Sequence, residues 1–301
     1  MIMTIYHKPV LLTESVEGLG IKPDGMYVDV TFGGGGHSKA ILDQLGPDGR
    51  LIAFDQDKDA LANTIHDERF LLINENFKHI KRFLRFHGIK QVDGILADFG
   101  ISSHQIDEPE RGFSTRHQGR LDMRMNQDDP VSAFEVVNEY DEGQLRSIFY
   151  QYGELRKAPV LARRIIEGRQ QASIEMTSDL NEVLRPVLPK RRENKILAQV
   201  YQAIRIEVNR ELDALKEFLL QTTQLIKPGG RLSIISYHSL EDRLVKRFMR
   251  NGLFEGEPER DIYGNVEVPF KRIGKLIIPS EEEIEANSRA RSAKLRIAEH
   301  N

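Results

Sequence analysis

Cysteine is missing from the 301 residues, and the sequence also lacks a strong net charge and any long apolar run. Without cysteine there is no disulfide, no thiolate zinc site and no cysteine nucleophile. The formal net charge of −3 excludes binding of nucleic acid through overall positive charge, so a nucleic-acid surface must be a local patch. No apolar run reaches the roughly 18 residues that span a bilayer, and His7, Lys8 and Pro9 stand where a signal peptide would be apolar. We expect a cytoplasmic protein with no membrane partner.

The first hundred residues alternate short apolar runs with helix-length segments. This alternation predicts parallel strands joined in βαβ units, and therefore an α/β fold. The predicted strands are Met26–Thr31, Leu51–Phe54, Phe70–Ile73 and Gly94–Ala97. Helices are expected at Ser38–Leu45 and from Ala60 onward.

The strand signal disappears between residues 110 and 214. Helical spacing instead predicts four helices, which are Asp141–Tyr152, Ala158–Gln171, Thr177–Leu188 and Ile196–Phe218. Thr177 or Ser178 is the expected cap of the third helix. We expect residues 110–214 to form an all-helical subdomain inserted into a discontinuous sheet domain, residues 1–109 and 215–301.

Strand signals return after the insertion. The segment Lys227–Gly230 predicts a turn, Arg231–Ser236 a strand and Ser239–Met249 a basic helix. Two late runs, Lys275–Ile278 and Ala293–Ala298, predict edge strands, and the acidic run Glu281–Glu285 predicts a solvated helix start.

Four consecutive glycines, Gly33 to Gly36, follow the first predicted strand and precede His37. Glycines in this place let the backbone turn sharply and approach a ligand, and the free N–H groups of the next helix face it. The pattern from Asp29 is D-x-x-x-G-x-G rather than the G-x-G-x-x-G of dinucleotide sites, and the lysine of a P-loop is missing. The acidic residue favours an aminoacid-bearing nucleoside such as S-adenosylmethionine. A glycine turn without a ligand is the simpler alternative.

Two further carboxylates end predicted strands. Asp55 follows Gly36 by 19 residues, where an acid accepts hydrogen bonds from both hydroxyls of a ribose or caps the next helix. Asp98 ends the fourth strand, and ligands of such sheets lie beyond the carboxyl ends of the strands. Asp98, Ser102 or Ser103 is therefore placed to orient an attacking amine and to take up its developing charge. The alternatives are that Asp98 only binds the cofactor and that the serines cap a helix.

An arginine-rich stretch, residues 111–124, contains Arg111, Arg116, Arg120 and Arg124 with Phe113 among them. Such residues suit phosphate contacts and base stacking in RNA recognition, while a solvated loop that pairs its own charges is the alternative. Further basic clusters that together would form a local patch are Lys190–Arg192, Arg243/Lys246/Arg247/Arg250 and Arg289/Arg291/Lys294/Arg296.

The histidines show no spacing typical of a metal site. His7 and His238 are expected to be structural, whereas His37 lies beside the glycines. We expect no metal cofactor.

Several of these stretches, taken in order, resemble the bacterial RsmH (MraW) methyltransferases. The matching segments are His7–Leu12, Thr31–Ser38, Asp55–Asp57, Asp98–Gln105, Arg111–Ser114, Leu121–Met125, Tyr152–Glu154, Gln202–Asn209, Pro228–Arg243 and Arg289–Arg296. The chain departs from the family pattern at Arg120, where proline is common, and at Tyr201 and Tyr237, where phenylalanine is usual. The D/N-P-P-Y signature of many amino-methyltransferases is replaced by Asp98-Phe99-Gly100.

The resemblance implies a Rossmann-like class I methyltransferase sheet and S-adenosylmethionine-dependent methylation of the N4 amine of a cytidine in the decoding region of 16S ribosomal RNA, within the small ribosomal subunit. It implies cofactor contacts from Gly35, Gly36, His37, Asp55, Phe77, Asp98 and Gln105, and an RNA-facing helical insertion. A homodimer is carried as a hypothesis. The alternatives from other classes are a nicotinamide-dependent oxidoreductase and a non-catalytic RNA-binding assembly protein.

Overall fold

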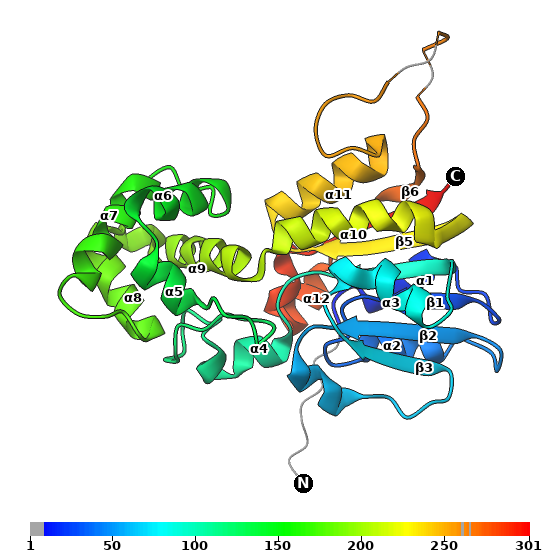
Figure 1. Ribbon diagram of the computed structural model, residues 1–301, viewed down its shortest axis with the longest axis horizontal. Helices are drawn as coiled ribbons and strands as arrows, with labels where there is room; N and C mark the ends of the chain where they lie inside the picture. Colours follow the sequence, from blue (N-terminus) through cyan, green and yellow to red (C-terminus); the bar gives the residue numbers. More distant parts are fainter. Residues whose placement is uncertain (1–8, 260–261, 265) are drawn as a thin grey trace. The chain divides into compact units, whose positions relative to one another are not determined.

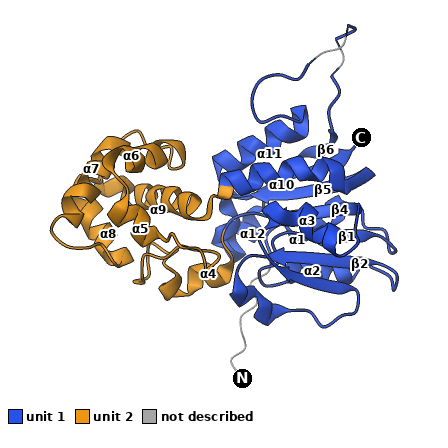
Figure 2. Ribbon diagram, viewed as in Figure 1, with its two compact units in different colours: residues 1–100, 212–301 blue, residues 101–211 orange. Residues whose placement is uncertain are grey.

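The computed structural model describes residues 9–259, 262–264 and 266–301, and it divides the chain into two compact units (Figure 1, Figure 2). Unit 1 is formed by the chain up to Gly100 and from Leu212 onward, and unit 2 by Ile101–Glu211. The boundaries therefore lie at residues 100/101 and 211/212, rather than at the expected 109/110 and 214/215.

Unit 1 is built on a seven-stranded sheet with the order β3-β2-β1-β4-β5-β7-β6. The strands are β1 (Met26–Asp29), β2 (Arg50–Asp55), β3 (Phe70–Asn74), β4 (Val92–Asp98), β5 (Ile226–Ser236), β6 (Phe270–Ile277) and β7 (Lys294–His300). The first five run parallel, whereas β7 is antiparallel to both β5 and β6. This is the predicted Rossmann-like α/β fold. The sequence expectation that Ala293–Ala298 forms an edge strand is wrong, because β7 lies between β5 and β6.

Helices cover both faces of this sheet. Because side chains alternate along a strand, Leu96 of β4 packs on one face with α1 (Leu12–Leu19) and α2 (Gly36–Leu42). Its neighbours Ile95 and Ala97 pack on the opposite face, whose helices are α3 (Ile80–Phe86), α10 (Glu211–Leu225) and α11 (Ser239–Asn251). The strand order reverses between β1 and β4, which is where doubly wound sheets bind ligands.

Two local predictions in unit 1 need correction. The segment from Ala60 forms only a 3₁₀ turn, Lys58–Asn63, in which Ala60 is the one buried residue and Asp57 is the N-cap. The predicted turn Lys227–Gly230 lies inside β5 as an irregularity opposite Asp93, with Gly229 at φ 75°. The acidic run begins α12 (Glu281–Ala286), which Ser280 caps.

Unit 2 is helical, and its described residues contain no strand beyond an isolated bridge between Arg120 and Met176. Its helices are α4 (Ser103–Asp107), α5 (Ala133–Glu139), α6 (Glu142–Gln151), α7 (Ala158–Arg169), α8 (Thr177–Leu184) and α9 (Glu193–Asn209). They surround an apolar core of their own, which includes Phe149, Leu161 and Ile204. Among the described residues of both units, no helix is long and apolar enough to cross a membrane.

Three helix predictions in this part of the chain are wrong in detail. The periodic run Ile196–Phe218 is two helices, because Arg210 adopts a left-handed conformation with φ 48° between α9 and α10. The helix from Thr177 stops at Leu184, before a 3₁₀ turn that contains Pro186. Neither Thr177 nor Ser178 caps α8, because both lie inside the helix and Met176 is the N-cap, whose N–H donates to Asp179 at 2.9 Å.

Candidate active site

The glycine turn joins β1 to α2, and its three last glycines have different surroundings. A Cβ on Gly35, where φ is 75°, would lie 3.0 Å from the ring of Phe32, and a Cβ on Gly36 would lie 2.2 Å from Pro9. The fold itself therefore requires glycine at both positions. A Cβ on Gly34 would meet no atom within 4 Å. Gly34 borders open space, where a ligand is able to approach the backbone closely.

Asp29 shapes this turn from inside the protein. Its side chain is fully buried and accepts hydrogen bonds from the Ser38 hydroxyl at 2.7 Å and the Thr31 N–H at 3.1 Å. These bonds fasten the start of α2 to the end of β1. The sequence interpretation took Asp29 as a sign of a nucleoside ligand, but its carboxylate is engaged by the protein's own groups.

Asp55 lies at the carboxyl end of β2 and also supports the turn. Its Oδ2 accepts the N–H of Gly33 at 2.7 Å, and its Oδ1 accepts the N–H of Asp57 at 2.9 Å. Burial raises the pKa of Asp55 to about 6, although both hydrogen bonds oppose that shift. Because a carboxylate has about four acceptor positions, each oxygen keeps one for a ribose hydroxyl.

Asp98 lies at the carboxyl end of β4 between an imidazole and a phenol. The Tyr237 hydroxyl, just after β5, donates to Oδ1 at 2.8 Å. The Nδ1 atom of His37 lies 3.8 Å from Oδ2. On the far side of the ring, Nε2 of His37 lies 3.2 Å from the carbonyl oxygen of Val10. A carbonyl only accepts, so Nε2 carries the hydrogen, and a neutral ring presents an unprotonated Nδ1 toward Asp98.

The buried position sets the charge of these three groups. Burial raises the pKa of Asp98 to about 6, and the hydroxyl of Tyr237 partly offsets that rise. Burial lowers the pKa of His37, whose side chain is only 6% exposed, and holds the pKa of Tyr237 well above 10. At neutral pH the group therefore consists of a carboxylate, a neutral imidazole and a neutral phenol. The single negative charge lies on Asp98, whose side chain is 22% exposed.

Phe77 follows β3, at the start of a 3₁₀ turn that Asn76 caps. Its ring centroid lies 5.5 Å from those of both Phe99 and Phe218, which belong to the same unit. These neighbours fix the half-buried ring of Phe77 at the carboxyl edge of the sheet.

Ser102 and Gln105 belong to unit 2, where they close the start of α4. The Ser102 hydroxyl accepts the N–H of Gln105 at 3.2 Å, and Oε1 of Gln105 accepts the N–H of Ser102 at 3.1 Å. This reciprocal arrangement is a capping box. It supports the capping alternative for Ser102 and leaves Asp98 as the stronger candidate for the chemistry.

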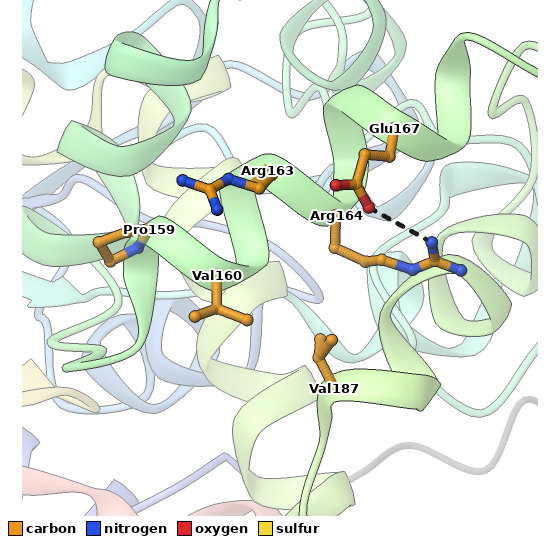
Figure 3. Close-up of a pocket in the computed structure, with 6 residues that line it drawn as sticks. All are labelled: Pro159, Val160, Arg163, Arg164, Glu167 and Val187. Atoms are coloured by element: carbon orange, nitrogen blue, oxygen red, sulfur yellow. Dashed lines mark ion pairs between the residues drawn. The ribbon is translucent and has the colours of Figure 1, made fainter.

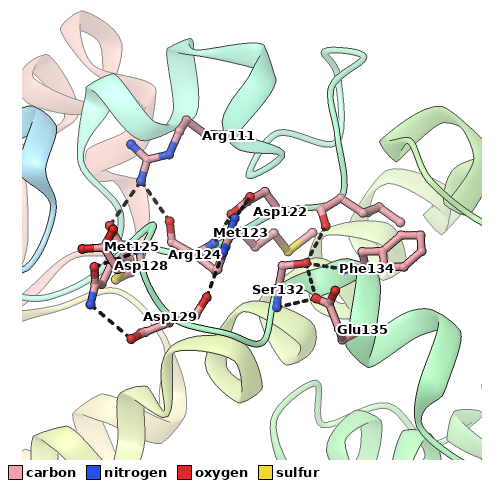
Figure 4. A network of polar contacts seen from close by, with 12 residues as sticks. Arg111, Asp122, Met123, Arg124, Met125, Asp128, Asp129, Ser132, Phe134 and Glu135 are labelled. Atoms are coloured by element: carbon pink, nitrogen blue, oxygen red, sulfur yellow. Dashed lines mark hydrogen bonds and ion pairs between the residues drawn. The ribbon is translucent and has the colours of Figure 1, made fainter.

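The arginine-rich loop of unit 2 uses two of its four arginines internally (Figure 4). Arg111 is 6% exposed and donates to the carbonyl oxygens of Arg124 and Met125. Arg124 donates twice to the carboxylate of Asp122, at 2.6 and 3.0 Å, and once to the carbonyl oxygen of Asp129.

Arg116 and Arg120 are exposed on the same loop. They therefore keep their guanidinium groups accessible to a phosphate, whereas Arg111 and Arg124 shape the loop that carries them.

Tyr237 is the site residue that sequence reasoning missed. The sequence marked it only as a departure from the phenylalanine usual in the resembling family, yet its hydroxyl contacts Asp98. The signal in the sequence was the hydroxyl itself, four residues before an acidic side chain, Glu241, that accepts the N–H of Tyr237 at 2.9 Å. His238 begins α11 with its Nε2 3.1 Å from Glu241, which fits the structural role expected of it. His7 lies outside the described residues.

Comparison with known proteins supplies the family. The model of the MraW methylase family matches residues 4–301. The chain belongs to the MraW methylase family. A protein of Christiangramia forsetii is 68% identical over 99% of both chains, and one of Flavobacterium johnsoniae is 69% identical over 98% of this chain and 97% of its own. A relative from Bacteroides thetaiotaomicron is 54% identical over 98% and 97%. All three are named ribosomal RNA small subunit methyltransferase H. This membership of a methylase family gives no support to the oxidoreductase or the non-catalytic alternative.

Proposed function

We propose that this chain transfers a methyl group from S-adenosylmethionine to the N4 amine of a cytidine in small-subunit 16S ribosomal RNA. The observation that carries the proposal is the carboxylate of Asp98, held beside His37 and Tyr237 at the point where the strand order reverses. The family to which the chain belongs and the names of its relatives support the same type of reaction and the same kind of RNA.

The carboxyl edge of the sheet fits the proposed cofactor. Gly34 borders open space at the turn, and Asp55 keeps an acceptor position on each oxygen for the two ribose hydroxyls. Phe77 supplies an apolar face for an adenine ring. Gly35, Gly36 and His37 hold the turn in shape, and Gln105 remains a proposed contact from unit 2. When bound, S-adenosylmethionine supplies a methyl group activated by its positively charged sulfur.

The chemistry that remains for the protein is orientation and charge. The exocyclic amine of cytosine is a poor nucleophile because its lone pair is delocalised into the ring, and it becomes positive as it is methylated. The carboxylate of Asp98 accepts a hydrogen bond from that amine and stabilises the developing charge. As the N–C bond to the methyl group forms and the sulfur keeps the electron pair of the broken S–C bond, the amine proton passes to Asp98. Tyr237 holds one carboxylate oxygen by its hydroxyl, so the carboxylate is oriented before the substrate arrives. His37, neutral and bonded to the Val10 carbonyl, stays out of the proton transfer.

Unit 2 is proposed to recognise the RNA. Exposed Arg116 and Arg120 contact phosphates, while Arg111 and Arg124 keep the loop in the conformation that presents them. Because the scheme uses no metal, we expect full activity after treatment with EDTA. We expect the reaction to take place in the cytoplasm, on RNA of the small subunit.

The test is methylation in vitro. Purified protein is incubated with methyl-labelled S-adenosylmethionine and with small-subunit RNA from a strain that lacks the enzyme, and the nucleosides are separated by mass spectrometry. We expect label in N4-methylcytidine alone. Label in another nucleoside would refute the proposed amine, and thermal stabilisation by NAD but not by S-adenosylmethionine would refute the proposed cofactor.

A further inference from the structure

A cavity of about 220 Å³ lies in unit 1 between α11, β6 and β7, on elements that do not carry Asp29, Asp55 or Asp98. Its lining is either cationic or apolar, and no acidic residue is among the described residues that form it. The lining residues are Lys246, Met249, Arg250, Phe270, Arg272, Lys275, Leu276, Arg296 and Ile297.

Local geometry gathers these side chains on one side. Lys246, Met249 and Arg250 have the spacing i, i+3 and i+4, which places them on one face of α11. Arg272 and Lys275 are three residues apart and would point to opposite faces of a regular strand. The register of β6 shifts between Ile273 and Ile277, with Gly274 at φ 65°, and both cations line the same cavity.

Most of the cations at this cavity lack an acidic partner. Arg296 is the exception, because its Nε lies 2.8 Å from Asp242. Lys246, Arg272 and Lys275 are exposed and form no ion pair with any residue that the structure describes. Their positive charges repel one another, so an anion between them stabilises the cluster.

A second cavity, of about 240 Å³ in unit 2, shows the contrast (Figure 3). It also carries two arginines, but Glu167 lies in its lining and pairs with Arg164 at 3.6 Å. Arg163 lies 4.0 Å from Glu142. The charges there are balanced by the protein itself, whereas those around the cavity of unit 1 are left for a partner.

We propose that the cavity lined by α11, β6 and β7 binds single-stranded RNA of the substrate, on elements other than the strand that carries Asp98. Lys246, Arg272 and Lys275 contact phosphates, while the buried side chains of Met249, Phe270 and Ile297 form an apolar floor for a base or sugar. Its volume is below the roughly 300 Å³ of usual small-molecule pockets, which suits one nucleotide of a strand. This inference rests on the proposed function, which supplies RNA as the substrate.

The test compares two triple variants of the full chain. Lys246→Ala/Arg272→Ala/Lys275→Ala removes three cations from the cavity. Arg85→Ala/Lys90→Ala/Lys271→Ala removes three exposed cations that do not line it, one of them on β6. Binding of a fluorescein-labelled, single-stranded 12-nucleotide RNA is measured by anisotropy over a range of salt concentrations. Methyl transfer is measured in parallel on small-subunit RNA.

The cavity variant is expected to bind the RNA at least about tenfold more weakly near 0.1 M salt, with the slope of log affinity against log salt flatter by about 2. Its KM for RNA should rise with kcat unchanged, and the control variant should match the wild type. Equal binding and equal slopes for both variants would overturn the proposal while methylation by the wild type stands. Displacement of the RNA by poly-glutamate as effectively as by unlabelled RNA of equal charge would also overturn it, in favour of an acidic polypeptide. If the wild type binds RNA through this cavity yet methylates none, the proposed function fails and the RNA site stands.

Discussion

Asp98 of unit 1 and Arg124 of unit 2 are both charged side chains in motifs that the sequence predicts to be functional. They differ in how many hydrogen bonds they make with the rest of the protein. Among the described residues, Asp98 accepts one side-chain hydrogen bond, from Tyr237, and keeps its remaining acceptor positions. Arg124 makes three hydrogen bonds, two to Asp122 and one to the carbonyl of Asp129. A buried charged group with few hydrogen-bond partners is available to interact with a substrate. A charged group whose hydrogen bonds are all made within the protein stabilises the fold instead.

The largest effect is expected from Asp98→Asn. The amide is nearly the same size but carries no charge, so it does not stabilise the positive charge on the amine, and methyl transfer should fall at least about a hundredfold. Single-turnover rates at saturating RNA and cofactor measure this step. Asp93→Asn is a control carboxylate on the same strand, and a comparable loss there would contradict the special place of Asp98.

The same Asp98→Asn change should stabilise the protein without its ligands at pH 8. The pKa of Asp98 rises from 3.8 to about 6 on folding, so its ionisation costs stability as the pH increases through that window. Asparagine removes the cost, which a shift of this size places at about 3 kcal/mol at pH 8. Thermal unfolding at pH 8 and pH 5 checks this, and the gain should shrink at pH 5. A gain that is equal at both values would contradict the assigned charge.

Arg124→Ala tests the other side of the comparison. It leaves the carboxylate of Asp122 without its two charge-assisted bonds, so the free energy of unfolding should fall by about 2 kcal/mol. Arg116→Ala on the exposed part of the loop should change it by less than about 0.5 kcal/mol. Chemical denaturation measures both. Similar values for the two variants would mean that Arg124 is not a structural residue.

Tyr237→Phe keeps the aromatic ring and removes the hydroxyl. That hydroxyl lowers the pKa of Asp98, so its loss should move the acidic limb of the pH–rate profile, which we expect near pH 6 for the wild type, to higher pH. The rate at pH 8 should change little. A profile that is unchanged in position would contradict the effect of the hydroxyl on the pKa of Asp98, and a uniformly lower rate would leave it only the role of orienting the carboxylate.

The smallest effect is expected from Gly34→Ala. Since a Cβ there meets no protein atom within 4 Å, the melting temperature of the ligand-free protein should not change, while the affinity for S-adenosylmethionine falls. Gly36→Ala is the matched contrast, because its Cβ would overlap Pro9 and destabilise the fold. Calorimetric titration and thermal unfolding separate the two effects. Unchanged affinity in Gly34→Ala would place the ligand elsewhere.

Local pattern predicted the strands of the sheet well, because apolar runs such as Leu51–Phe54 are long enough to identify a buried strand and glycines mark their ends. It failed where tertiary contacts decide. The helix break at Arg210 could not be predicted, because the residue with positive φ there is not a glycine. The place of β7 inside the sheet follows from its pairing with β5, and no local sequence feature predicts that pairing.

Within the candidate site, sequence reasoning proposed Asp55 and Asp98 but not the side chains that contact them. Asp55 and Asp98 were identified because carboxylates at strand ends share one edge of a parallel sheet. The hydrogen bond from Tyr237 joins positions 139 residues apart, and the inward use of Arg111 and Arg124 depends on carbonyl groups that a sequence does not place. The sequence therefore predicts which types of side chain lie at the site, whereas the hydrogen-bond partner of each side chain is known only from the structure.

The central claim is that methyl transfer to the N4 amine of cytidine depends on the carboxylate of Asp98. It is tested most directly in a strain deleted for this gene. Nucleoside mass spectrometry of its small-subunit RNA is compared after complementation with the wild type or with Asp98→Asn, at matched protein levels. We expect N4-methylcytidine to be lost on deletion, restored by the wild type and not restored by the variant. Unchanged N4-methylcytidine after deletion, or full restoration by Asp98→Asn, would contradict the account.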